Sequence, residues 1–280
     1  GKSTLLPLTL LDQNWLEGKK ILMLEPRRLA ARMIASRMAD MLNEELGQTV
    51  GYRIRLDVNV SDKTRLEVVT EGILTRMLQS DNALEDVGVL IFDEFHERSI
   101  HAEIALAFSR ETQKILRPDL RILIMSATID SGFLSKLLKA KVLSGKGMQY
   151  PVEIKYAGET DRYLIPEMTS RVVVNAVNES PGDALVFLPG EGEIKKCEDI
   201  LKKNLPEFKI HPLYGRLQQS RQNAAVFPDK NGNRKVVLAT SIAETSLTIE
   251  GIKIVIDSGF GRTSGFDPKA WFSQRETILI

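Results

Sequence analysis

Asp93 and Glu94 are the residues of this sequence whose types and spacing most clearly suit chemistry. They directly follow the apolar run Val87–Phe92, which predicts a buried β-strand. In parallel sheets, ligands bind outside the carboxyl ends of the strands, where this pair would lie. Adjacent carboxylates repel each other unless a cation or a proton is present, so the pair favours Mg²⁺ held by Asp93 and a water activated by Glu94. A solvated loop is the alternative reading.

The chain begins Gly1-Lys2-Ser3-Thr4, which matches the second half of the phosphate-loop pattern G-x-x-x-x-G-K-[ST]. In that loop, backbone amides surround phosphate groups, the lysine contacts the β- and γ-phosphate oxygens, and the hydroxyl group binds Mg²⁺. By itself the tetrapeptide fits a polar N-terminus equally well. Two expected strands separate it from Asp93, and this spacing favours a shared nucleotide site.

Polar or small residues also follow three other apolar runs in the first half of the chain. These residues are Arg27, Arg28, Thr70, Gly72, Ser126 and Thr128. Arginines, hydroxyl groups and backbone amides at helix starts are groups that contact phosphodiesters. Surface arginines and simple turns would explain each residue singly, but several such strand ends together predict one binding edge.

The second half contains a similar polar stretch at residues 239–249, directly after an apolar run at 235–239. A stretch so rich in hydroxyl groups is not typical of a core. We expect it to face the strand ends of the first half across a cleft, with a nucleotide and a polymer strand between them.

Apolar β-prone runs alternate with helical patterns along the chain. Residues 29–46 have apolar side chains at helical spacing, for example, with Gly47 as the expected stop. The alternation predicts an α/β fold with mostly parallel sheets covered by helices. The pattern loosens over residues 141–160, a glycine-rich connector. We therefore expect two domains, residues 1–150 and 151–280.

Composition limits the classes of function. The 280 residues are 43% hydrophobic and 27% charged, which excludes global disorder. The formal charge of +1 means that a nucleic-acid surface must be a local groove. The single cysteine, Cys197, excludes an internal disulfide and fits a reducing compartment, so a cytoplasmic location is expected. No zinc-ligand spacing and no apolar run of about 18 residues is present, so neither a zinc site nor a membrane partner is expected.

Taken in order, eight motifs resemble the DEAH/RHA branch of the superfamily 2 helicases. They are GKST at 1–4, LEPRRLAAR at 24–32, TEGILTRML at 70–78, DEFHERS at 93–99, SAT at 126–128, LVFLPGEGEI at 185–194, PLYGRL at 212–217 and ATSIAETSLTIEGI at 239–252. The resemblance covers essentially the whole chain. It implies two tandem RecA-like domains of the phosphate-loop NTPase class, with ATP and Mg²⁺ at their interface and single-stranded RNA or DNA across the top.

The resemblance also implies roles residue by residue. Nucleotide contacts would come from Gly1, Lys2, Ser3, Thr4, Glu244 and Ser246. Ser3 and Asp93 would bind Mg²⁺, and Glu94 would be the general base. His96, Ser126 and Thr128 would couple hydrolysis to domain movement. The nucleic-acid track would be lined by Arg27, Arg28, Thr70, Gly72, Thr240 and Thr245.

Three features depart from the family pattern. The first half of the phosphate loop does not precede Gly1, and Ser241 stands where the family usually has Asn. The motif Q-R-x-G-R-x-G-R, whose arginines contact the γ-phosphate, is also absent. The start at Gly1 and the apolar end at Ile280 suggest a fragment cut at both ends. We therefore expect the 280 residues alone to be weakly active or inactive.

The leading hypothesis is an ATP-dependent RNA helicase that couples hydrolysis to translocation on, or unwinding of, single-stranded or structured RNA. One alternative is a DNA-directed translocase, since no base-reading motif is visible. The other is a non-catalytic, ATP-gated nucleic-acid clamp. The presence of Lys2, Asp93 and Glu94 argues against the clamp.

Overall fold

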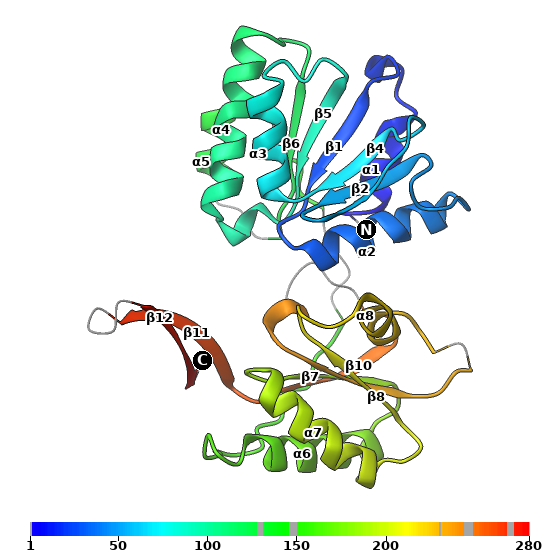
Figure 1. The fold of residues 1–280 in the computed structure, drawn as a ribbon, viewed down its shortest axis with the longest axis vertical. Coiled ribbons are helices and arrows are strands. Elements are labelled where there is room, and N and C mark those ends of the chain that lie inside the picture. Colours follow the sequence, from blue (N-terminus) through cyan, green and yellow to red (C-terminus); the bar gives the residue numbers. More distant parts are fainter. Residues whose placement is uncertain are drawn as a thin grey trace. The chain divides into compact units, whose positions relative to one another are not determined.

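A computed structural model of the chain describes residues 2–127, 131–145, 150–229, 231–243, 249–267 and 272–279. The chain divides into two compact units, with the division after Met148. Each unit contains a parallel or mostly parallel sheet with helices against it (Figure 1). The expected α/β architecture is therefore confirmed.

The first unit has a six-stranded sheet in the order β3-β2-β4-β1-β5-β6. Its strands are β1 (Lys20–Leu24), β2 (Val50–Ile54), β3 (Asp57–Asn59), β4 (Leu66–Val69), β5 (Val87–Phe92) and β6 (Arg121–Ile124). Its helices are α1 (Leu5–Leu11), α2 (Arg28–Met41), α3 (Glu71–Ser80), α4 (Ile100–Ile115) and α5 (Ser131–Leu138), with short 3-10 turns η1 (Asn14–Leu16) and η2 (Phe95–Glu97). All strand pairs are parallel except β2 with β3.

The central strands of this sheet are apolar throughout because both faces are covered. Successive side chains of β1 point to opposite faces: Ile21 and Met23 join one core cluster, whereas Leu22 and Leu24 join the other. Helices α1 and α2 cover the first face, and α3, α4 and α5 cover the second (Figure 1). This burial on both sides is why these runs lack the polar alternation of a surface strand.

The second unit has a four-stranded parallel sheet in the order β10-β7-β9-β8 and a separate antiparallel hairpin. Its strands are β7 (Asp183–Phe187), β8 (Lys209–Leu213), β9 (Lys235–Ala239), β10 (Ile252–Asp257), β11 (Phe260–Asp267) and β12 (Phe272–Leu279). Its helices are α6 (Ile165–Glu179), α7 (Glu191–Asn204) and α8 (Gln219–Val226), followed by the 3-10 turn η3 (Ser241–Ala243). Helices α6 and α7 lie on one face of the sheet and α8 on the other (Figure 1).

Helix α2 ends earlier than the sequence predicts. The expected helix over 29–46 stops at Met41, because Asn43 adopts a left-handed conformation with φ 55°. Asparagine tolerates this conformation and so ends helices much as glycine does, which makes Gly47 unnecessary as a stop. Strands β2 and β3 and the hairpin β11-β12 were not predicted. Glycines and charged side chains interrupt their hydrophobic pattern.

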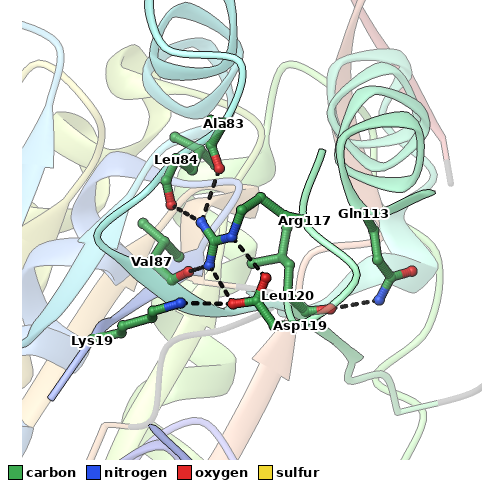
Figure 2. A network of polar contacts seen from close by, with 8 residues as sticks. All are labelled: Lys19, Ala83, Leu84, Val87, Gln113, Arg117, Asp119 and Leu120. Atoms are coloured by element: carbon green, nitrogen blue, oxygen red, sulfur yellow. Dashed lines mark hydrogen bonds and ion pairs between the residues drawn. The ribbon is translucent and has the colours of Figure 1, made fainter. Parts of the chain in front are cut away.

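A buried arginine fixes the point where β5 begins. The Arg117 guanidinium donates to the carbonyl oxygens of Ala83, Leu84 and Val87 at 2.6–3.0 Å and to both carboxylate oxygens of Asp119 at 2.7 and 2.8 Å (Figure 2). These bonds use all five N–H donors that an arginine has. Lys19 adds an ion pair to Asp119 at 2.7 Å. Arg117 thereby holds the connection between α3 and β5, the strand that leads to Asp93.

We predict that Arg117→Ala lowers the free energy of unfolding by about 2–4 kcal/mol, because it leaves three backbone carbonyl groups without their charged donor. Arg117→Lys should recover only part of this loss, since an ammonium group lacks the planar fork. Urea denaturation checks both variants. Lys114→Ala is the matched control, because Lys114 is an exposed cation in the last turn of α4, three residues before Arg117, and its loss should change stability by less than about 0.5 kcal/mol. Equal stability of Arg117→Ala and this control would contradict the prediction.

Candidate active site at the strand ends

Four strands of the first unit end in register at one edge of the sheet. Leu24 lies beside Val69 and Phe92, and Phe92 lies beside Ile124. Backbone bonds continue past the strand ends, from Asp93 N to Leu24 O at 3.0 Å and from Met125 N to Phe92 O at 2.8 Å. The loops that follow β1, β4, β5 and β6 are therefore brought together at this edge, as the sequence predicts.

Among the predicted site residues that the structure describes, Asp93 is the most buried, with 3% of its surface exposed. Its Oδ1 atom accepts a hydrogen bond from the Glu94 backbone amide at 2.9 Å. Its Oδ2 atom is buried and has no hydrogen-bond partner among the described residues. Burial raises the pKa of the carboxyl group, while the neighbouring Ser3 side chain, the Glu94 amide, and the charges of Lys2 and His96 act in the opposite direction.

Glu94 lies beside Asp93 in an unusual backbone conformation. Its φ of 49° is in the left-handed region, which residues other than glycine rarely adopt outside constrained sites. Its Oε2 atom is 3.2 Å from Nδ1 of His96. Burial, followed by the charge of Asp93, raises the pKa of the Glu94 carboxyl group. A carboxylate with a raised pKa is better suited to accept a proton near neutral pH.

Lys2 and Ser3 lie at the same edge. The Lys2 ammonium group donates to the backbone oxygen of Ser126 at 2.8 Å, which joins the start of the chain to the loop after β6. Lys2 and Ser3 both lower the pKa of Asp93, so their side chains lie close to that carboxyl group. Thr4 caps α1 without a side-chain hydrogen bond. The predicted phosphate-loop residues and the carboxylate pair are therefore neighbours, although they are about ninety residues apart in sequence.

The donor set around Asp93 fits a magnesium ion. Mg²⁺ commonly binds through one or two carboxylates, several waters and substrate phosphates rather than through a cage of protein side chains. The unpartnered Oδ2 atom of Asp93, with Ser3 beside it, matches that description. Among the described residues, no group of three or more His, Cys, Asp or Glu side chains is arranged to hold a metal.

The residues predicted for nucleic-acid contact differ in their surroundings. Arg28 is exposed at the first position of α2. Arg27, one residue earlier, forms an ion pair with Glu97, with 3.4 Å between Nε and Oε1. Thr70 is buried at the start of α3 and makes no side-chain cap there. Gly72 faces open space, because an added Cβ atom would meet nothing within 4 Å.

Thr240 lies directly after β9 in the second unit, and its amide donates to the Leu213 carbonyl oxygen at 3.3 Å. Several predicted residues lie outside the described part of the chain, namely Gly1, Thr128, Glu244, Thr245 and Ser246. The cleft that would bring these residues opposite Asp93 stays a prediction.

Sequence reasoning assigned no role to Glu97, although it lies three residues after Glu94. Its partner Arg27 is seventy positions away in sequence, on the loop after β1. The only signal in the sequence is that residues of opposite charge follow β1 and β5, two strands that turn out to be neighbours. The fold is needed to bring them together.

We predict that Asp93→Asn raises the melting temperature of the nucleotide-free protein at neutral pH, by about 2–4 °C for an effect of about 1 kcal/mol. Because the native pKa is raised, the carboxyl group stabilises the fold below the unfolded pKa near 4, and this contribution is lost as pH rises through the native pKa. The gain should therefore shrink towards acid pH in a thermal-unfolding series.

Asp119→Asn is the matched control for the sign of this effect. Hydrogen bonds from Arg117 and Lys19 lower the pKa of Asp119, so its charged form stabilises the fold above the unfolded pKa. This variant should melt at a lower temperature than the parent at neutral pH. If Asp93→Asn also lowered the melting temperature, burial would not be the dominant effect on that carboxyl group.

Comparison with known proteins agrees with this geometry. The family model described as "DEAD/DEAH box helicase" matches residues 1–136, and that described as "Helicase conserved C-terminal domain" matches residues 167–275. The crystal structure of the Escherichia coli DEAH/RHA helicase HrpB matches all of this chain with a TM-score of 0.90 and 46% identity, over 36% of that chain.

Curated relatives give the same result. The ATP-dependent RNA helicase HrpB of Escherichia coli K12 is 48% identical over all of this chain and 35% of its own length. The ATP-dependent RNA helicase HrpA of the same organism is 41% identical over 95% of this chain and 21% of its own length. The chain thus spans about a third or less of these relatives. With both helicase domains matched in order, the chain belongs to the DEAD/DEAH box helicases.

Proposed function

We propose that the protein is an ATP-dependent RNA helicase that couples ATP hydrolysis to translocation on, or unwinding of, RNA. This chain supplies the nucleotide site, and its 280 residues alone are weakly active or inactive. The observation that supports this proposal most is the juxtaposition of Lys2, Ser3, Asp93 and Glu94 at one sheet edge. A nucleic-acid clamp would need the phosphate contacts but not a carboxylate with a raised pKa beside them. The names of the relatives favour RNA over DNA as the nucleic acid.

Each residue has a distinct part in the proposed reaction. Lys2 leaves the Ser126 carbonyl oxygen to bind the β- and γ-phosphates, and Gly1 and Thr4 add nucleotide contacts from the second half of the phosphate loop. Ser3 and Asp93 would hold a Mg²⁺ ion, which would neutralise charge on the phosphates. Glu94 takes a proton from the attacking water. His96, whose Nδ1 atom is 3.2 Å from Oε2 of Glu94, couples hydrolysis to domain movement together with Ser126 and Thr128.

The nucleic-acid track and the second-domain contacts complete the proposal. Arg28, Thr70, Gly72, Thr240 and Thr245 line the track together with Arg27. Glu244 and Ser246 contact the nucleotide from the second domain. Domain limits of 1–150 and 151–280 are part of this proposal.

A cytoplasmic location is proposed for the protein. Its support is Cys197, the single cysteine, which is buried and unpaired as expected in a reducing compartment. In the described residues, no helix is both long and apolar enough to span a membrane.

We predict that Glu94→Gln lowers the rate of ATP hydrolysis by about 10²–10⁴-fold in the full-length protein, the usual contribution of a positioned acid–base group. Glutamine keeps the size of the side chain but cannot accept the proton. The affinity for ATP should change little, because Lys2, Ser3 and Asp93 remain. Steady-state phosphate release and nucleotide titration measure the two quantities separately.

Asp93→Asn is the matched comparison, since it should weaken Mg²⁺-dependent nucleotide binding as well as hydrolysis. Parent-like hydrolysis by Glu94→Gln would reject Glu94 as the base and favour the clamp. Hydrolysis stimulated by single-stranded DNA but not by RNA, at fixed salt, would instead favour a DNA-directed translocase.

We further predict that Arg28→Ala weakens single-stranded RNA binding equally for all sequences. It should also reduce the slope of log affinity against log salt by about one unit, because one phosphate contact is lost. Fluorescence anisotropy over a salt series measures this slope. Lys114→Ala is the control, because α4 runs away from the strand-end edge and Lys114 lies in its last turn. An unchanged slope for Arg28→Ala would show that Arg28 does not contact nucleic-acid phosphates.

A further inference from the structure

The ion pair between Arg27 and Glu97 joins two loops of the strand-end edge. Arg27 follows β1 and precedes α2, whereas Glu97 ends the turn η2 after β5. Their side chains are 27% and 20% exposed, with 3.4 Å between Nε and Oε1. Because the pair is partly buried, salt screens its attraction less than it screens that of a fully exposed ion pair.

Glu97 belongs to the loop that carries Glu94, and this loop has a strained backbone. Glu94 and Arg98 both have left-handed φ values, 49° and 52°. Such conformations persist only where surrounding contacts hold them. Phe95 anchors the middle of the loop by edge-to-face packing on Phe92, with ring centroids 6.2 Å apart. The Arg27–Glu97 pair is a contact near the end of the same loop.

Arg27 also belongs to the track assigned to nucleic-acid phosphates. A carboxylate and a phosphodiester are both anionic acceptors that suit the guanidinium fork, so they compete for it. Glu97 lies beside this guanidinium group in the structure.

We propose that Glu97 is a positioning residue that occupies the Arg27 guanidinium in the nucleic-acid-free state, and that an RNA phosphate displaces it and so releases the loop that carries Glu94. This inference rests on the proposed function. It assigns the link between RNA binding and hydrolysis to one pair of side chains, of which Glu97 lies three residues after the base.

Thermodynamic reciprocity gives the proposal two independent consequences. If RNA binding favours the loop without the ion pair, then a loop without the ion pair must bind RNA more tightly by the same factor. The first consequence is that loss of the ion pair changes the rate of ATP hydrolysis. The second is that loss of the ion pair tightens RNA binding, which can be measured without ATP. The two can therefore be tested separately.

The test is Glu97→Gln in the full-length protein. Glutamine removes the charge and keeps the length of the side chain. The affinity for a fluorescein-labelled single-stranded oligouridylate, measured without nucleotide, should increase by about 2- to 5-fold, the range that such ion pairs contribute. The RNA-free rate of ATP hydrolysis should rise, and the ratio of RNA-stimulated to RNA-free rates should fall by a similar factor.

Two variants control for charge and for folding. Glu103→Gln removes a carboxylate that pairs with Arg98 at 3.6 Å, with about half of each side chain exposed, and it should change neither measurement. The double variant Arg27→Ala, Glu97→Gln should bind the oligouridylate with the same affinity as Arg27→Ala alone, because the competition no longer exists. Thermal unfolding shows whether each variant is folded.

Weaker RNA binding by Glu97→Gln would overturn the proposal, since it would mean that Glu97 holds Arg27 ready for RNA. The proposal would also be overturned if Glu97→Gln increased the affinity for the oligouridylate equally with Arg27 and with Arg27→Ala. The cause would then be the lower negative charge of the protein rather than competition for Arg27. A parent protein that does not hydrolyse ATP would reject the proposed function, while the nucleotide-free binding test would still decide the competition. Hydrolysis that RNA stimulates equally in parent and variant would reject the inference alone.

Discussion

The common register of four parallel strands is the constraint on which the site depends. Leu24, Val69, Phe92 and Ile124 end their strands side by side, and the next backbone amides continue the same hydrogen-bond ladder. A shift of one strand by one residue would turn its side chains to the other face and separate its loop from the others. The apolar residues on both faces of β1 and β5 hold this register, because each face packs against its own layer of helices.

The electrostatics of the edge follow from the same burial. Asp93 lies directly at the end of a strand that is buried throughout, so its carboxylate is desolvated before any ligand arrives. That cost is the physical basis for binding a cation and, through it, phosphates. At Glu94 the backbone turns out of the strand direction in a left-handed conformation, which is strained. Stability and function therefore oppose each other at these two residues.

Much of this arrangement could be predicted from the sequence. Runs such as Val87–Phe92 are apolar because the strands are buried, and the residues after them carry the chemistry because strand ends are exposed to ligands. The ends of helices were less predictable, since Asn43 rather than Gly47 ends α2. Pairings between distant loops, such as Arg27 with Glu97 and Lys2 with Ser126, could not be predicted, because they depend on which strands are neighbours. The roles of the second-domain residues rest on resemblance.

We propose that Lys2, Ser3 and Asp93 form one site for a magnesium nucleotide. The most direct measurement is a crystal structure of the protein with Mg²⁺ and a non-hydrolysable ATP analogue. We expect the Lys2 ammonium group to leave the Ser126 carbonyl oxygen for the β- and γ-phosphates, and Mg²⁺ to lie beside the Ser3 hydroxyl and the Oδ2 atom of Asp93. A nucleotide bound elsewhere, with Lys2 still on Ser126 and no metal near Asp93, would contradict it.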